Sequence, residues 1–363
     1  MAGKEKKKLR SGFTTGACAA AAAKAATLVL LRHRLLDHVE IPFPTGDRHG
    51  FFLHSCVCQD GRVTVSIIKD AGDDPDVTNG AEIIAIVEQG MPQANGAELT
   101  ISGGPGVGRV TKPGLPVEVG APAINPVPQK MIRAAVAEAF KEAGIGETLP
   151  LQVTICVTDG EILAEKTLNS RLGILGGLSI LGTTGIVRPV SARAWTDTID
   201  ASMKVARAVG LSKVILSTGR TSEAAVQKQL HLPEEAQVMM GDYLAYALKA
   251  ARRHGFAQIY LSGMWAKILK CALGIPQTHV RHGALEVSQA ADLLHELGLD
   301  RRNADELTTA NTAREIYLRL KAAGRDDLIH CVCEQAKRYA MKRSGLEVEV
   351  FLVTSEEGVV AHV

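Results

Sequence analysis

The sequence predicts an α/β protein of two domains, residues 1–190 and residues 191–363. At 363 residues the chain is longer than the size at which a single hydrophobic core usually stops growing. Its first part combines a long alanine-rich segment with short β-branched runs, which predicts helices beside an antiparallel sheet. From Ser191 onwards helices alternate with short strands, a pattern typical of a doubly wound sheet.

The composition is that of an ordinary globular protein, with 22% charged and 46% hydrophobic residues. The net charge is only +2, and aromatic residues make up 4% of the chain. A nucleic-acid-binding protein usually carries a clear basic excess and aromatic stacking platforms. We therefore expect no nucleic-acid partner.

Cellular location is predicted from three features. The basic opening is interrupted by Arg10, Ser11 and Thr14, so it does not resemble a secretory signal, and no later 18-residue window is wholly apolar. Seven cysteines, an odd number without a C-x-x-C pair, indicate reduced thiols and no zinc site. These features predict a cytoplasmic protein that does not span a membrane.

The run from Arg10 to Ala26 joins a capping signal to a strong helix former. Thr14, Thr15 and Gly16 offer hydroxyls and a permissive backbone where a helix begins. The helix is expected over residues 17–31, with Lys24 as its only charge. Its first N–H groups could form an anion site. The alternative is a capped helix packed tightly in the core.

The remaining elements of the first domain follow from alternation and turn signals. Asp60-Gly61 predicts a hairpin between two of the strands. The runs at 81–88 and 97–102 are expected to pair with each other. The expected strands are 39–43, 51–58, 62–69, 81–88, 97–102 and 151–157, and the expected helix is 129–143.

Four aspartates lie between Asp70 and Asp76, which suggests a metal site. Their spacing does not follow the alternating ligands and distal glutamate of a calcium loop. Aspartate and proline are also ordinary turn residues. We predict no metal ligand in the protein.

A glycine-rich segment after the strand at 97–102 invites a nucleotide-binding interpretation, with Gly103, Gly104, Gly106 and Gly108 as candidates. A dinucleotide fingerprint requires a helix to follow. Two prolines soon after Gly108 forbid that helix. A ligand-contacting turn and a plain loop both remain open.

A second glycine-rich segment, residues 171–190, has five glycines and no charged residue between Arg171 and Arg188. We expect it to be buried where backbones approach closely. Its Gly182-Thr183-Thr184-Gly185 repeats the Thr-Thr-Gly of the N-terminus. The repeat is either chance or a shared use of hydroxyls and amides to line one cavity.

In the second domain three predicted strands, at 213–216, 236–240 and 258–261, end in small or polar residues. Open α/β sheets bind ligands at the carboxyl ends of their strands, so this edge is the best site predicted on physical grounds alone. Short turns also need glycine without any ligand, which is the alternative. The residues are Ser217, Thr218, Gly219 and Arg220, then Gly241 and Asp242, then Ser262 and Gly263.

Polar and cationic groups follow the third of these turns: Lys267, Lys270, Thr278, His279 and Arg281. They could hold carboxylates, although lysines on a helix are often merely solvated. The remaining expected elements are helices at 194–209, 244–253 and 265–273, helical regions at 305–323 and 328–344, and a final strand at 346–354.

Together these segments resemble the cobalt-precorrin-5B C1-methyltransferase (CbiD) family of anaerobic cobalamin biosynthesis. The similarity spans almost the whole chain. The matching segments are R-S-G-F-T-T-G-A-C-A-A-A-A-A-K-A-A from Arg10, K-D-A-G-D-D-P-D-V-T-N-G from Lys69, G-P-G-V-G-R-V-T-K-P-G-L from Gly104, I-L-G-G-L-S-I-L-G-T-T-G-I-V-R-P from Ile174, S-T-G-R from Ser217, M-G-D from Met240 and G-M-W-A-K-I-L-K-C-A-L-G-I-P-Q-T-H from Gly263.

The resemblance implies methyl transfer from S-adenosylmethionine to C1 of a cobalt-bound, ring-contracted tetrapyrrole. It also implies a first domain like the second domain of ribosomal protein S5 and a Rossmann-like second domain. The cobalt would belong to the substrate. A homodimer stays open, and no membrane or nucleic-acid partner is implied.

The candidate site residues then divide into two sets. The donor-binding set is Gly103, Gly104, Gly106, Gly108, Ser217, Thr218, Gly219, Gly241, Asp242, Ser262 and Gly263. The set for a polycarboxylate substrate is Thr14, Thr15, Gly16, Lys24, Lys69, Arg109, Lys112, Thr183, Thr184, Arg188, Arg220, Lys267, Lys270, Thr278, His279 and Arg281. No catalytic base is assigned, because positioning a methyl sulfonium against an electron-rich carbon supplies most of the acceleration.

Two other functions compete with the methyltransferase. A small-molecule kinase could use an S5-like domain with the aspartates between Asp70 and Asp76 on Mg²⁺, although no Walker lysine loop is present. A non-catalytic carrier would bind the tetrapyrrole but not the methyl donor. Neither accounts for the full set of matching segments.

Overall fold

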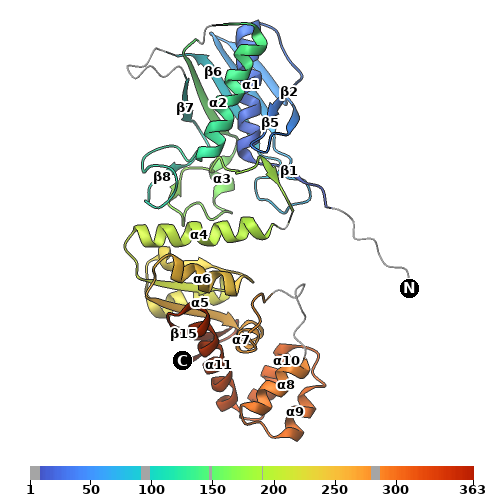
Figure 1. Ribbon diagram of the computed structural model, residues 1–363, viewed down its shortest axis with the longest axis vertical. Helices are drawn as coiled ribbons and strands as arrows, with labels where there is room; N and C mark the ends of the chain where they lie inside the picture. The colour runs from blue at the N-terminus through green and yellow to red at the C-terminus, as the bar shows by residue number, and fades with distance from the viewer. Residues whose placement is uncertain (1–8, 91–98, 147–148, 190, 279–286) are drawn as a thin grey trace, which may run out of the picture. The chain divides into compact units, whose positions relative to one another are not determined.

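The computed structural model describes residues 9–90, 99–146, 149–189, 191–278 and 287–363 (Figure 1). These residues form two compact units, Met1–Ser191 and Ala192–Val363, each with its own hydrophobic core. The division lies beside the boundary predicted between residues 190 and 191. The likeness of each unit to a named fold stays a prediction.

Unit 1 is built on a five-stranded sheet in the order β4-β5-β6-β9-β7. Two long helices, α1 (Thr15–Arg32) and α2 (Pro126–Ala143), pack against each other, and α1 lies on β5 and β6 (Figure 1). The strands are β4 (Ser55–Gln59), β5 (Arg62–Ile68), β6 (Glu82–Gln89), β7 (Leu99–Gly103) and β9 (Leu151–Val157).

Short elements complete unit 1. The two-stranded ribbon of β2 (His38–Pro42) and β3 (Arg48–Phe52) stands apart from the main sheet. Two-residue strands pair β1 (Gly12–Phe13) with β11 (Ile186–Val187) and β8 (Arg109–Val110) with β10 (Ile174–Leu175), and α3 is a short helix (Gly160–Ala164).

The predicted hairpin at Asp60-Gly61 is confirmed, since both residues adopt positive φ between β4 and β5. Two other predictions for unit 1 were wrong. The strand expected at 51–58 is split between β3 and β4, because the chain leaves the ribbon at Leu53 and joins the main sheet. The runs at 81–88 and 97–102 do not pair, because β9 lies between β6 and β7.

Unit 2 contains a second five-stranded sheet in the order β13-β12-β14-β15-β16. The first four strands are parallel, and β16 is antiparallel to β15. The strands are β12 (Lys213–Ser217), β13 (Gln237–Met239), β14 (Gln258–Met264), β15 (Glu347–Thr354) and β16 (Gly358–His362).

Helices cover both faces of this sheet, as the doubly wound prediction requires. One face packs on α5 (Arg220–Leu230) alone. The other face carries the larger core, formed with α4 (Ala192–Ala208), α6 (Leu244–Arg253), α7 (Trp265–Ala272) and α11 (Asp326–Ser344), and extended by α8 (Val287–Glu296), α9 (Arg301–Leu307) and α10 (Ala313–Ala322). A 3₁₀ turn, η1 (Glu234–Ala236), precedes β13.

Several elements of unit 2 were missed or misjudged. The helices α5 and α8 and the strand β16 were not predicted. The helical region expected at 305–323 is interrupted before Thr312, which caps α10 by accepting a hydrogen bond from the backbone N–H of Glu315. The strand expected to end at Leu261 continues to Met264, so Ser262 and Gly263 lie inside β14.

One described helix, α1, is long and apolar enough to cross a membrane by length and composition. However, 83% of that segment is buried inside the structure. It packs between α2 and the sheet of unit 1, and this burial accounts for its apolar character.

Candidate functional site

The start of α1 is held by contacts within the protein. Thr14 caps the helix, its hydroxyl accepting the Ala17 N–H at 3.2 Å. The Gly16 N–H donates to the Leu181 carbonyl, and the Cys18 N–H to the Thr14 carbonyl. These contacts favour the alternative of a capped core helix, and substrate binding by Thr14, Thr15 and Gly16 stays a prediction.

The two Thr-Thr-Gly segments lie side by side. The Thr14 N–H donates to the Gly185 carbonyl at 2.9 Å, and the Leu181 N–H donates to the Thr15 hydroxyl at 2.9 Å. A Cβ on Gly182 would lie 2.4 Å from the Thr14 hydroxyl oxygen. The structure therefore joins the segments by direct contact. A cavity shared between them stays a prediction, and so do substrate contacts from Thr183 and Thr184.

The glycine loop from Gly103 to Gly108 is packed against other backbone. Gly106 has φ +75°, and a Cβ there would lie 1.9 Å from the Val157 carbonyl oxygen. A Cβ on Gly108 would meet the Gly177 carbonyl at 2.7 Å, and Cβ atoms on Gly103 and Gly104 would meet the side chains of Pro122 and Cys156. Packing alone explains these glycines, and no helix follows them. Donor binding by this loop stays a prediction.

Two buried lysines of unit 1 have structural partners. Lys24 is 1% exposed and donates to the Glu40 carbonyl, Glu138 and Glu142. All three N–H groups of its ammonium are used within unit 1, which gives Lys24 a structural role, and a substrate contact from it stays a prediction. Lys69 is also 1% exposed and donates to Asp76 at 2.8 Å.

The aspartate-rich loop is held by protein groups. Asp70 forms an ion pair with Arg10, whose backbone N–H donates to Asp73. Burial opposes ionisation of Asp76, but hydrogen bonds from Lys69 and Thr78 outweigh it and lower its pKa. Within the described part of the chain, no group of three or more histidine, cysteine or acidic side chains is arranged to hold a metal.

The strand order of unit 2 places a topological switch point at one edge of the sheet. From β12 the chain passes to β13 on one side and to β14 on the other, so the strand order reverses between β12 and β14. Ligands of open α/β sheets bind at such a switch point, outside the carboxyl ends of the strands. Ser217 ends β12 at this point, and Thr218 and Gly219 follow it.

The residues at the switch point differ in access. Ser217 and Ser262 are fully buried, and their hydroxyls lie 2.9 Å apart. Gly263 is buried as well. Gly219 is partly exposed at the N-cap of α5, and a Cβ added to it would meet no atom within 4 Å. A ligand can therefore approach the backbone at Gly219, whereas the two buried serines link β12 to β14 beneath the surface.

Asp242 organises the neighbouring cluster. Its carboxylate accepts hydrogen bonds from Lys267 and from the Thr278 hydroxyl. Lys270 donates to the Thr278 carbonyl at 2.9 Å, and burial, followed by the charge of Lys267, lowers the pKa of Lys270. The predicted lysines thus come together as expected, but around a carboxylate of the protein itself.

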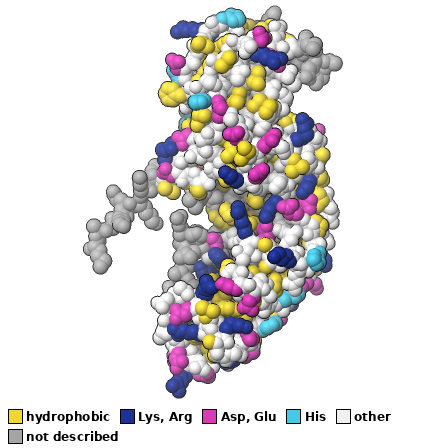
Figure 2. Space-filling view, turned by 180° about the vertical axis from the view of Figure 1, so that it is seen from behind, with side chains coloured by type: hydrophobic (Ala, Val, Ile, Leu, Met, Phe, Trp, Pro, Cys, Tyr) yellow, Lys and Arg dark blue, Asp and Glu magenta, His cyan; other side chains and the backbone are white. Residues whose placement is uncertain are grey.

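The other predicted cations are dispersed. Arg188 and Arg220 are exposed, and Arg109 donates to the Gly120 carbonyl. His279 and Arg281 lie outside the described residues. On the face shown in Figure 2, basic and acidic side chains are interspersed rather than gathered by sign.

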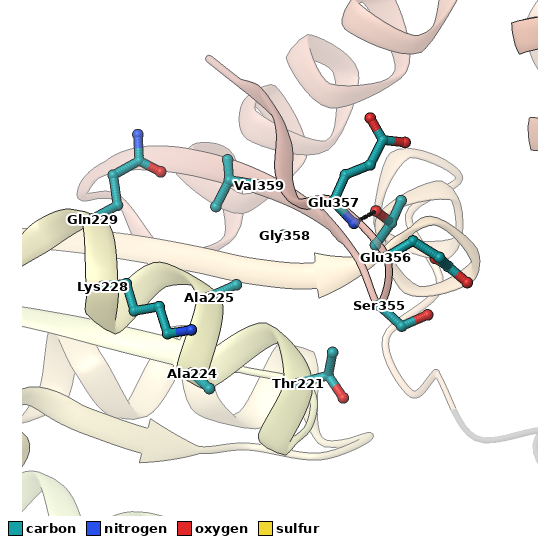
Figure 3. A pocket seen from close by; sticks show the side chains of 11 residues that line it. Thr221, Ala224, Ala225, Lys228, Gln229, Ser355, Glu356, Glu357, Gly358 and Val359 are labelled. Carbon is teal, nitrogen blue, oxygen red and sulfur yellow. Dashed lines mark hydrogen bonds between the residues drawn. The ribbon is translucent and has the colours of Figure 1, made fainter.

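A surface pocket of about 560 Å³ lies between α5 and the β15–β16 turn (Figure 3). Lys228 enters it from the helix, and Glu356 and Glu357 come from the turn; Glu356 pairs with Arg314 at 2.9 Å. None of the predicted site residues lines this pocket. It adjoins the carboxyl edge at Thr221, one residue after Arg220, and at Thr354, the last residue of β15.

One residue at this edge was given no role by sequence reasoning. Trp195, in the first turns of α4, donates its indole N–H to the Met240 carbonyl beside Gly241. The available signal was the rarity of tryptophan, since the chain has only two.

Comparison with known proteins decides the family. The model described as "CbiD" matches residues 2–189, and the one described as "CbiD, C-terminal domain" matches residues 277–363. A relative from Desulfotalea psychrophila named "Cobalt-precorrin-5B C(1)-methyltransferase" is 54% identical over 98% of this chain and 98% of its own. The chain belongs to the CbiD family.

A second curated relative carries the same name. One from Geobacter metallireducens, named "Cobalt-precorrin-5B C(1)-methyltransferase", is 49% identical over 95% of this chain and 96% of its own. A crystal structure of the cobalamin biosynthesis protein cbiD from Archaeoglobus fulgidus is 29% identical, covers 72% of this chain and 79% of its own, and has a TM-score of 0.41. The resemblance inferred from the sequence is confirmed, and the chain is an enzyme of the methyltransferase class in cobalamin biosynthesis.

Proposed function

We propose that this protein transfers the methyl group of S-adenosylmethionine to C1 of cobalt-precorrin-5B, giving cobalt-precorrin-6A. The observation that carries the proposal is the near-complete coverage of curated CbiD methyltransferases at 54% and 49% identity. Neither the kinase nor the carrier accounts for that similarity.

The carboxyl edge of unit 2 is the part of the described structure that best fits the methyl donor. It has a switch point between β12 and β14, an unobstructed backbone at Gly219 and a partly exposed carboxylate at Asp242. The N-terminus of α5 directly follows Gly219, and helix N-termini favour carboxylate groups such as that of the donor's methionine part. The same properties are missing from the Gly103–Gly108 loop, where protein atoms fill the Cβ positions.

The chain's own contribution to catalysis is positioning. When bound, S-adenosylmethionine supplies an activated methyl group, and S-adenosylhomocysteine leaves as the new carbon–carbon bond forms. Thr218 and Gly219 would hold the donor in line with the ring carbon, while the exposed Arg220 would orient the carboxylates of the tetrapyrrole. Fixing this alignment removes most of the entropic cost of the reaction.

The test is a single-turnover reaction of the purified protein with cobalt-precorrin-5B and S-adenosylmethionine carrying a deuterated methyl group. We expect the mass of the tetrapyrrole to increase by one labelled methyl, with the label located at C1 by NMR. Modification of the tetrapyrrole that requires ATP and Mg²⁺, or binding of the tetrapyrrole without methyl transfer, would contradict the proposal.

A further inference from the structure

We propose that Trp195 is the platform on which the adenine ring of the methyl donor stacks. The inference rests on the proposed function and adds a residue from α4, outside the segments that suggested the donor site. It is carried by the way the indole is anchored, exposed and placed along the carboxyl edge.

The indole is anchored by two contacts with the end of β13. Its N–H donates to the Met240 carbonyl at 3.1 Å. Gly241 adopts φ +55°, and a Cβ at that position would lie 2.8 Å from Cζ2 of the indole. The glycine is thus needed both for its backbone angle and for the close approach of the ring. These contacts hold the ring in one orientation before any ligand arrives.

Despite this anchoring, the side chain is 44% exposed. The other tryptophan, Trp265, is only 5% exposed in the core beside Tyr317. Tyr243 lies next to Trp195 with ring centroids 6.3 Å apart and planes inclined by 27°. A nearly parallel, partly open aromatic pair on a fixed backbone suits the stacking of a flat heterocycle.

The position of the ring fits an elongated ligand that begins at the switch point. The Met240 N–H donates to the Ser217 carbonyl, so the residue that anchors Trp195 is bonded to the end of β12. Adjacent strands are about 4.8 Å apart, and β12 lies between β13 and β14. The end of β13 is therefore roughly 10 Å from β14, on the other side of the switch point. A nucleoside whose sulfur end lies near Gly219 would therefore extend its base toward Trp195.

Charge favours the adenine over the tetrapyrrole at this end of the edge. Asp242 directly follows Gly241, and its carboxylate pairs with Lys267. A polycarboxylate would meet this carboxylate at close range, whereas adenine is neutral. The tetrapyrrole carboxylates would be better placed near the exposed Arg220.

The experiment measures S-adenosylhomocysteine binding by calorimetry to the full chain and to Trp195→Ala, Trp195→Phe and Leu318→Ala. Removing an aromatic that stacks on a base typically weakens binding about ten- to a hundredfold, so that loss is expected for the alanine variant. Trp195→Phe keeps a ring and should stay within about threefold of the parent. Leu318, 54% exposed on α10, is the matched control and should not change the affinity.

A spectroscopic readout separates stacking from a general loss of structure. In a Trp265→Phe background Trp195 is the only tryptophan, and its emission should change on adding S-adenosylhomocysteine but not methionine. Normal binding by Trp195→Ala, or unchanged Trp195 emission at saturation, would overturn the platform while leaving the methyltransferase proposal intact. No binding of S-adenosylhomocysteine to the parent chain would contradict both.

Discussion

The glycine- and threonine-rich segments of unit 1 and the carboxyl edge of unit 2 use similar residues for different purposes. In unit 1, Thr14 caps a helix, and Gly106 and Gly177 bring backbones into contact. In unit 2, Gly219 has no neighbour within 4 Å of its Cβ position, and Trp195 is 44% exposed. Glycine density alone therefore does not identify a ligand site; what surrounds the missing side chain does.

The largest effect is expected from Gly106→Ala. The new methyl group would overlap the Val157 carbonyl, and φ +75° would be strained for alanine. We expect the free energy of unfolding to fall by about 4 kcal/mol, measured by urea denaturation. Gly146→Ala, where a Cβ meets nothing within 4 Å, is the control and should change stability by less than about 1 kcal/mol.

A Gly106→Ala protein that kept nearly wild-type stability but had lost S-adenosylhomocysteine binding would contradict this interpretation of unit 1. It would mean that the loop serves a ligand rather than the packing of unit 1. The donor site would then have to be sought near Gly103–Gly108.

The second comparison sets Lys24 against Lys267. Lys24→Met leaves Glu138 and Glu142 without the ammonium that joins them at the α1–α2 contact, so we expect a loss of about 3 kcal/mol in unfolding free energy. Lys267 is 28% exposed, and Lys267→Met should cost less than about 1 kcal/mol. Thermal melts of both variants check the order; equal losses would show that the Asp242 cluster is as structural as the one around Lys24.

The smallest effect is the response to acid. Burial would raise the pKa of Glu138, but hydrogen bonds from Arg48 and Lys24 outweigh it and hold the pKa below its usual value of about 4.5. Its stabilisation is present above the unfolded pKa and is lost as pH falls through the folded one. Unfolding free energy should therefore fall below about pH 4.5, and less steeply in Glu138→Gln. An identical slope in the variant would show that this carboxylate contributes nothing.

Local patterns allowed much of the fold to be predicted, but not the pairing of distant strands. The alanine helix, the hairpin at Asp60-Gly61 and the alternating second domain follow from propensity and turn chemistry. The insertion of β9 between β6 and β7 depends on contacts more than 50 residues apart, which no local pattern encodes. The exposed helix α5 has a weakly apolar sequence and was missed for that reason.

The candidate site could likewise be predicted only where local sequence patterns reveal it. The ends of β12 and β13 and the lysines near Asp242 could be located because strand ends carry small and polar residues. The burial of Lys24 and of Ser262 could not be predicted, because it depends on which other elements pack against these residues. Trp195 reaches the edge from another element, so only the folded chain brings it to Gly241.

The most direct test of the account is amide hydrogen exchange with and without saturating S-adenosylhomocysteine. We expect added protection in peptides covering residues 215–221 and 240–244, and none around residues 103–108. Protection confined to residues 103–108, with the edge of unit 2 unchanged, would contradict the assignment of the donor to that edge.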